Sequence, residues 1–181
     1  SPSNPMDAYV MVQQAIACDD PVVFFEPKRL YWDKADVDDT VDIASAVSPF
    51  EARVVHPGSS VTVVCYGPMV RTCLEAATAA EHDGLDLEVI DLRSMSPLDV
   101  ATVAASVRRT GRLVIVHEAP VFLGLGAELA ARITEECFYS LEAPVLRVGG
   151  YHTPYPPSRL EEEYLPDLDR VLDAVDRAMA Y

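Results

Sequence analysis

Residues 61–92 decide the fold of this chain, and they read VTVVCYGPMVRTCLEAATAAEHDGLDLEVIDL. The stretch opens and closes with apolar, valine-rich runs at 61–66 and 87–92, which is the pattern of strands that are buried on both faces. Between the runs, apolar side chains recur at helical spacing and predict one buried helix face: Val70, Cys73, Leu74 and Ala77. A strand, a helix and a strand in this order predict two parallel strands joined by a helix.

The alternation continues to the end of the chain, with strands predicted at 113–118 and 143–150 and helices predicted at about 125–138 and 168–180. Another helix is expected between Ser96, its N-cap, and Gly111, its end, with Asp99 as a capping acid in the first turn. Strands alternating with helices predict a three-layer α/β fold. Its mostly parallel sheet would have about five strands, with helices on both faces.

The N-terminal part follows a different pattern. A helix is predicted from about Asp7 to Ala17, with Asn4 as its N-cap, and the apolar segment PVVFFEP at 21–27 is predicted to be a short buried strand. Residues 33–58 are acidic and then loop-like, so we interpret them as a linker. Because the chain opens on Ser1 at what looks like a strand-to-helix joint, we expect it to be a piece of a longer protein.

Composition limits the classes of partner. The chain has 29 acidic and 14 basic residues, a formal net charge of −15 and a pI of about 4.5. Such a chain repels nucleic acid and anionic membranes, and it suits a basic protein partner. The four cysteines form no C-x-x-C pair, so zinc ligation is not indicated, and Cys65 and Cys73 are expected in the core. No signal peptide or transmembrane-length apolar stretch is seen, so a cytoplasmic location is expected, or the mitochondrial matrix in a eukaryote.

His117 and Glu118 stand at the end of a predicted strand, where catalytic acids and bases are often found. The alternative is that His117 hydrogen-bonds a loop and Glu118 holds a backbone amide. The other histidines, His56, His82 and His152, show no metal-ligand spacing. The Gly124-x-Gly126 pair lacks the third glycine of a dinucleotide-binding loop, so it indicates a tight turn before a helix.

Three longer stretches carry a family resemblance: FFEPKRLYW at 24–32, TGRLVIVHEAPVFLGLGAEL at 110–129 and ECFYSLEAPVLRVGGYHTPYP at 136–156. The chain resembles the beta subunit of the thiamine-diphosphate-dependent first component of a 2-oxo acid dehydrogenase complex. The HEAP wording at 117–120 resembles the branched-chain enzyme more than the pyruvate enzyme. The resemblance implies that residues 1–32 are the tail of a pyrimidine-binding domain and residues 59–181 a transketolase-like C-terminal domain.

The resemblance implies no catalytic or cofactor-binding residue in this chain. Thiamine diphosphate and magnesium would be held by residues upstream of Ser1 and by an alpha subunit. One family site, a potassium ion, reaches the segment AIACDD and would use Ala15, Cys18 and Asp20. The family usually has Asp and Asn where this chain has Cys18 and Asp20, so only main-chain carbonyls would preserve ligation at Ala15 and Cys18.

The resemblance also implies partners, namely an alpha subunit, a second beta subunit and the small, basic subunit-binding domain of the acyltransferase. The expected docking residues are Glu161, Glu162, Glu163 and Tyr181 with its terminal carboxylate. His152 stands where family members often carry Asp, so that contact is expected to differ. Three alternatives stay open: a pyruvate or acetoin dehydrogenase beta subunit, a stand-alone protein-binding module, and a small enzyme centred on His117 and Glu118.

Overall fold

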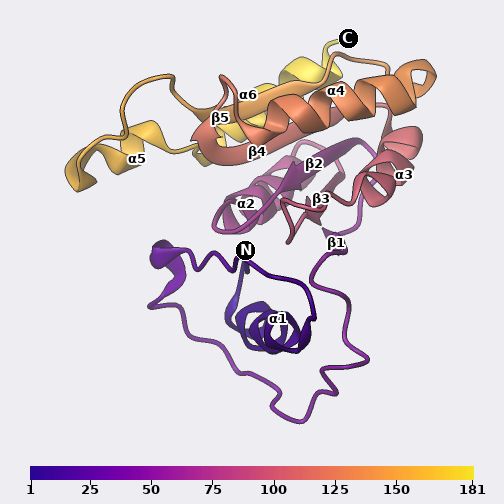
Figure 1. The fold of residues 1–181 in the computed structure, drawn as a ribbon. Coiled ribbons are helices and arrows are strands. Elements are labelled where there is room, and N and C mark those ends of the chain that lie inside the picture. The colour runs from indigo at the N-terminus through magenta and orange to yellow at the C-terminus, as the bar shows by residue number, and fades with distance from the viewer.

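The computed structural model describes all residues from Ser1 to Tyr181 and contains one five-stranded sheet (Figure 1). The strands lie in the order β1-β3-β2-β4-β5. Their bounds are Arg53–His56 (β1), Val61–Cys65 (β2), Leu87–Asp91 (β3), Leu113–Pro120 (β4) and Leu146–Gly150 (β5). Strands β2 to β5 pair in parallel, and β1 runs antiparallel to β3 at one edge.

Two helices cover each face of the sheet, so the predicted three-layer fold is confirmed. The helices α2 (Met69–Glu81) and α6 (Leu168–Met179) pack on one face, and α3 (Val100–Thr110) and α4 (Leu125–Cys137) pack on the other. Successive residues of β2 serve both cores, because side chains alternate along a strand: Val63 belongs to the first and Val64 to the second. Cys65 and Cys73 are buried free thiols, as expected.

The end of the α3 helix agrees with the prediction, and its start does not. Gly111 ends α3 in the left-handed conformation, with a φ of 69°. The N-cap is Asp99 rather than Ser96, and its carboxylate accepts from the backbone N–H of Thr102 at 3.0 Å. The second carboxylate oxygen accepts from the backbone N–H of Ala52 at 3.0 Å. A long-range contact therefore fixes this cap, and it lies outside the reach of local sequence patterns.

The N-terminal part contains one helix of more than one turn, α1 (Pro5–Ala17), capped by Asn4 as predicted. The predicted strand at 21–27 is wrong: the segment is extended but pairs with no strand, and Val23 and Phe25 are 77% and 57% exposed. An extended segment becomes a strand only when a neighbouring strand accepts its hydrogen bonds, and none lies beside it in this chain. Figure 1 shows α1 and a long loop near the β1 edge of the sheet.

Strand β1 lies within the segment that was interpreted as a linker. It has a register shift between Val54 and His56 and no regular alternation of buried and exposed residues, so its sequence carries no strand pattern. The remaining short elements are three single-turn 3-10 helices, η1 (Lys28–Leu30), η2 (Phe138–Ser140) and η3 (Ser158–Leu160), and the short helix α5 (Glu161–Tyr164). None of the helices has both the length and the apolar character needed to span a membrane.

Candidate functional site

His117 lies in β4 and is completely buried. Its Nδ1 lies 2.8 Å from the carbonyl oxygen of Ala119, so this nitrogen donates. Its Nε2 accepts from the backbone N–H of Gly126 at 3.2 Å. Burial lowers the pKa of the imidazole below its usual value, which agrees with a neutral ring that uses one nitrogen as donor and the other as acceptor. His117 therefore caps the first turn of α4 and has no free nitrogen for proton transfer.

Three glycines make room for this ring. A Cβ atom at Gly124 or Gly126 would lie 2.8 or 2.5 Å from the nearest imidazole atom, closer than real Cβ atoms pack. A Cβ atom at Gly149 would lie 3.0 Å from the ring, tighter than most real contacts. The Gly124-x-Gly126 pair thus has a steric purpose, which is to let α4 and β5 approach a buried histidine. We call His117 and these three glycines the histidine clamp. Of the two readings of His117, the geometry supports hydrogen bonding over catalysis, but the partners lie in β4 and in the first turn of α4 rather than in a loop.

Glu118 serves a different contact. Its carboxylate lies 3.1 Å from a guanidinium nitrogen of Arg29, and both side chains are partly exposed. The expectation that Glu118 holds a backbone amide is therefore not met. The pair joins the end of β4 to the segment that follows α1, so His117 and Glu118 act on opposite sides of the strand as structural residues. The small enzyme centred on them has no support in this geometry.

Two of the other histidines have contacts that involve no metal. His56 places Nδ1 2.9 Å from the carbonyl oxygen of Leu87 and Nε2 3.4 Å from the carboxylate of Glu81. The ring of His152 packs on Phe122 with 4.4 Å between centroids. No group of three or more His, Cys, Asp or Glu side chains is placed to hold a metal ion.

A buried charge network joins α1 to the sheet, and the sequence patterns did not reveal it. Asp7 is 3% exposed, and one carboxylate oxygen accepts from Arg53 at 2.7 Å and from the Asn4 amide at 2.8 Å. Its other oxygen lies 3.9 Å from a guanidinium nitrogen of Arg93, whose side chain is also buried. We call Asp7, Arg53 and Arg93 the charged joint. The sequence marked Asp7 only as the approximate start of a helix, because its charged partners are distant in sequence.

Arg93 also holds the long loop in place. One of its guanidinium nitrogens donates to the carbonyl oxygens of Ser48 at 2.7 Å and Glu51 at 3.2 Å. Its backbone has a φ of 58°, a region that side-chain-bearing residues rarely occupy. Its backbone N–H donates to Asp91 at 3.0 Å, and burial raises the pKa of the Asp91 carboxyl. The loop after β3 therefore connects the sheet to the N-terminal part.

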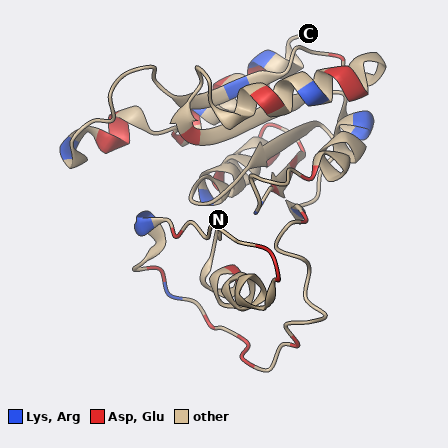
Figure 2. Ribbon diagram, viewed as in Figure 1, with Lys and Arg blue, Asp and Glu red and all other residues tan.

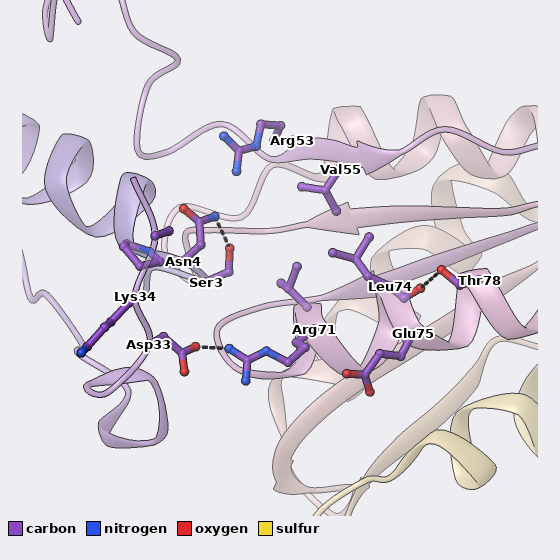
Figure 3. Close-up of a pocket in the computed structure, with 13 residues that line it drawn as sticks. Ser3, Asn4, Asp33, Lys34, Arg53, Val55, Arg71, Leu74, Glu75 and Thr78 are labelled. Atoms are coloured by element: carbon purple, nitrogen blue, oxygen red, sulfur yellow. Dashed lines mark hydrogen bonds and ion pairs between the residues drawn. The ribbon is translucent and has the colours of Figure 1, made fainter. Parts of the chain in front are cut away.

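A hollow lies beside the charged joint, between the N-terminal segment, β1 and α2 (Figure 3). Its charged groups are largely paired with one another: Arg71 of α2 pairs with Asp33, and Arg53 pairs with Asp7. Lys34 points away from Arg53 in this view. The hollow thus lies where the N-terminal segment packs against β1 and α2, and it offers a ligand no cluster of unpaired charges.

The expected potassium ligands come together only in part. Ala15 and Asp20 line one hollow, which Arg93 also lines, and Cys18 is not among its lining residues. Helix α1 ends at Ala17 without a basic residue in its last turn, and Cys18 continues in extended conformation. Asp20 is the one carboxylate of the three. A cation there would depend on main-chain carbonyls from Ala15 and Cys18, and it would share the hollow with a guanidinium.

The expected docking residues lie in two places. Glu162 and Glu163 are exposed on α5, while Glu161 is half-buried and accepts from the hydroxyl of Tyr155 at 3.0 Å. Tyr181 is 72% exposed at the C-terminus. Figures 1 and 2 show α5 far from the C-terminal end of α6. The acidic run and Tyr181 therefore do not form one continuous patch.

Comparison with known proteins agrees with the three-layer α/β fold and identifies the family of the domain. The family model "Transketolase, C-terminal domain" matches residues 51–171. The "Pyruvate dehydrogenase E1 component subunit beta" of Leifsonia xyli subsp. xyli is 51% identical over 100% of this chain and 53% of its own length. The "3-methyl-2-oxobutanoate dehydrogenase subunit beta" of Mycobacterium tuberculosis is 54% identical over 98% of this chain and 51% of its own length.

A solved structure titled "Split gene transketolase, inactive beta4 tetramer" matches with a TM-score of 0.74 and 26% identity. The match covers 99% of this chain and 56% of that chain. The chain thus spans about half the length of the relatives and the structure that it matches.

The fold and the histidine clamp define a three-layer α/β domain with a structural, buried histidine at the carboxyl end of its sheet. The chain belongs to the transketolase C-terminal domain family. The matched region begins just before β1, and so includes a strand that the sequence alone did not reveal.

Proposed function

We propose that this chain is part of the beta subunit of a 2-oxo acid dehydrogenase that decarboxylates branched-chain 2-oxo acids oxidatively and passes the acyl group to a lipoyl group. The main support is the 54% identity, over nearly the whole chain, to a 3-methyl-2-oxobutanoate dehydrogenase subunit beta. The HEAP wording at 117–120 is the second support, because it resembles the branched-chain enzyme more than the pyruvate enzyme. In this role the chain contributes architecture and docking.

Residues 1–32 would be the tail of a pyrimidine-binding domain. The connection to the C-terminal domain, expected at 33–58, would end before β1 at Arg53, because β1 is already part of the sheet. The exposed apolar side chains of the first segment support this division: Ile16, Val23, Phe25 and Trp32 are 57% to 89% exposed. Apolar groups in such numbers are rarely left in water, and a further part of a larger protein would cover them.

Thiamine diphosphate would supply the nucleophilic carbon and the electron sink for decarboxylation. Its site and the magnesium site would lie outside this chain. A potassium ion would use the carbonyls of Ala15 and Cys18 together with Asp20. The free carbonyls at the end of α1 suit a monovalent cation, whereas the nearby guanidinium of Arg93 opposes it.

The partners would be an alpha subunit, a second beta subunit and the basic subunit-binding domain of an acyltransferase. The net charge of −15 supports a basic partner, and exposed Glu162 and Glu163 offer it carboxylates. Glu161 and Tyr181 would contribute at most to separate contacts, given their placement. The cytoplasm, or the mitochondrial matrix in a eukaryote, would be the compartment.

The test is reconstitution of the complete beta subunit with its alpha subunit, followed by an assay of decarboxylation. We expect higher kcat/KM for 3-methyl-2-oxobutanoate than for pyruvate. A preference for pyruvate would favour the second candidate, a pyruvate dehydrogenase beta subunit, which the 51% identity to the Leifsonia protein supports. Activity with neither acid, in an assembled and thiamine-diphosphate-loaded complex, would contradict both.

A further inference from the structure

A third hollow, of about 480 Å³, lies at the carboxyl ends of β4 and β5, between the loops that follow these strands. Its principal lining residues are Phe122, Leu123, Arg147, Tyr151, His152 and Arg170. We call this set the β4–β5 hollow. In parallel α/β sheets, ligands bind outside the carboxyl ends of the strands, so the position is a suitable one for recognition.

The charge of the β4–β5 hollow is opposite to that of the chain. It is lined by two arginines, a histidine and no carboxylate, in a protein with 29 acidic and 14 basic residues. Neither Arg147 nor Arg170 belongs to any of the nine ion pairs. Both donate to backbone carbonyls instead: Arg147 donates to Val121 at 3.1 Å, and Arg170 donates to Tyr164 at 3.3 Å and also to Gly149. Their positive charges are therefore left without a carboxylate, the group that a guanidinium binds best.

The same hollow presents apolar and aromatic surface. Phe122 is 59% exposed and Leu123 is 85% exposed. The Phe122 ring packs on His152, and the guanidinium of Arg170 lies 4.6 Å from the centre of the Tyr151 ring. Tyrosine and arginine are the residues most enriched at the energetic centres of protein interfaces, and exposed apolar patches mark interaction sites.

The loop that carries these side chains is anchored at both ends. Leu123 has a φ of 57°, a strained region for a bulky residue, yet its side chain is almost fully in solvent. The backbone N–H of Val121 donates to Gly150 at 3.1 Å, and Gly124 belongs to the histidine clamp. A partner would thus meet a loop whose two ends are anchored, which lowers the entropic cost of binding.

We propose that the β4–β5 hollow binds an acidic segment of a protein partner that carries an apolar side chain next to its carboxylate. The carboxylate pairs with Arg147 and Arg170, and the apolar side chain packs against Phe122 and Leu123. The β4–β5 hollow therefore binds an acidic partner, whereas the acidic surface of α5 is proposed to bind a basic one. It does not depend on the function proposed above, because it rests only on the residues of the hollow.

The test uses the 181-residue chain and a fluorescein-labelled peptide of alternating Glu and Phe residues, followed by fluorescence anisotropy. We expect saturable binding at low salt that weakens as salt rises. Leu123→Asn should weaken binding about tenfold, because it removes the apolar contact. Asparagine tolerates a positive φ, so this variant keeps the loop. Arg147→Gln should weaken binding by a similar factor, about tenfold, because it removes a charged partner of the carboxylate.

Two matched controls remove equivalent groups elsewhere: Arg132→Gln on the exposed face of α4, and Val23→Asn in the N-terminal segment. Both should bind like the parent chain. Peptides with Gln in place of Glu, or Ala in place of Phe, should bind weakly. Far-UV circular dichroism establishes that each variant is folded. Equal losses in the control variants, undiminished binding of the Gln peptide, or no binding of the Glu-Phe peptide would overturn the proposal.

Discussion

Residues 1–50 and residues 51–181 are held in place by different forces. Among the first 50 residues the buried ones are Pro2, Ser3, Asp7, Val10 and Met11, whereas the whole chain has 53 buried residues, most of them in the two cores of the sheet. Burial of apolar surface is the dominant stabilising term of a domain, so the C-terminal part has its own source of stability. The N-terminal part depends on polar contacts at the charged joint.

Other contacts of the first part are polar as well. The side-chain amide of Gln14 donates to the carbonyl oxygens of Ile43, Ala46 and Val47 at 3.2 to 3.3 Å, which fastens the long loop to α1. The strength of these hydrogen bonds and ion pairs depends on distances and angles between atoms more than on the area of buried surface. We therefore expect changes in the sheet domain to lower global stability, and changes at the joint to open the N-terminal part locally.

The largest effect is expected from Leu129→Ala in α4. Leu129 is fully buried between α4 and the sheet, so truncation leaves a cavity and should lower the free energy of unfolding by about 3 kcal/mol. Urea denaturation followed by circular dichroism measures this. Val23→Ala, which truncates a side chain that is 77% exposed, is the matched control and should change little. A similar loss in both variants would refute the contrast between the two regions.

The next effect is expected from His117→Gln. The substitution leaves the half-buried carbonyl of Ala119 or the buried N–H of Gly126 without its partner, which should cost about 2 kcal/mol at neutral pH. His82→Gln changes an exposed histidine and should be nearly neutral. Full stability of the His117 variant would mean that the ring only fills space.

The parent chain should also lose stability in acid in a way that the Gln variant does not. Burial lowers the pKa of folded His117, so the unfolded state binds the proton more tightly. The contribution is therefore fully present above the ordinary histidine pKa of about 6.5 and is lost as the pH falls from there toward the folded pKa. Chemical denaturation at a series of pH values measures the difference, and parallel curves for the two proteins would contradict it.

A smaller effect, about 1–2 kcal/mol and local, is expected from Asp7→Asn at the charged joint. It removes the negative charge between Arg53 and Arg93 and leaves one buried guanidinium without compensation. Hydrogen exchange should speed up in residues 1–50 while β2 and β4 keep their protection. Asp36→Asn, in the exposed part of the long loop, is the control. Faster exchange throughout the sheet would show that the two regions unfold as one.

The smallest effect is expected from Arg29→Gln. The Arg29–Glu118 pair is partly exposed, so its loss should change the free energy of unfolding by less than about 0.5 kcal/mol. Thermal melts of the single variants and of the Arg29→Gln, Glu118→Gln double variant measure the coupling. A coupling energy well above this range would make the pair a second joint between the two regions.

Local patterns predicted most of the sheet domain, because strands buried on both faces and helices with one apolar face leave a clear periodicity. They failed where a partner distant in sequence decides the structure. The segment 21–27 has the composition of a strand but has no strand beside it, and Arg53–His56 lacks the pattern but pairs with β3. The helix α3 begins at Asp99 because its carboxylate also holds Ala52.

The candidate site shows the same division. The sequence pointed to His117 with Glu118 and, separately, to the Gly124-x-Gly126 turn, and it left the role of His117 open between catalysis and hydrogen bonding. The structure adds Gly149 from β5 and assigns the imidazole to backbone hydrogen bonds. The charged joint was not predicted, because Asp7 and Arg93 are separated along the chain by 86 positions and only folding brings their charges together.

The sequence by itself determined the order of strands and helices, the burial of the four parallel strands and the acidity of the chain, since these depend on composition and on spacing along one element. Tertiary structure alone decided which edge β1 joins, which groups neutralise Asp7, and why a histidine at a strand end is enclosed by glycines. The physical reason is that hydrogen bonds and close packing join atoms in space, and their strength depends on distances that no local pattern records.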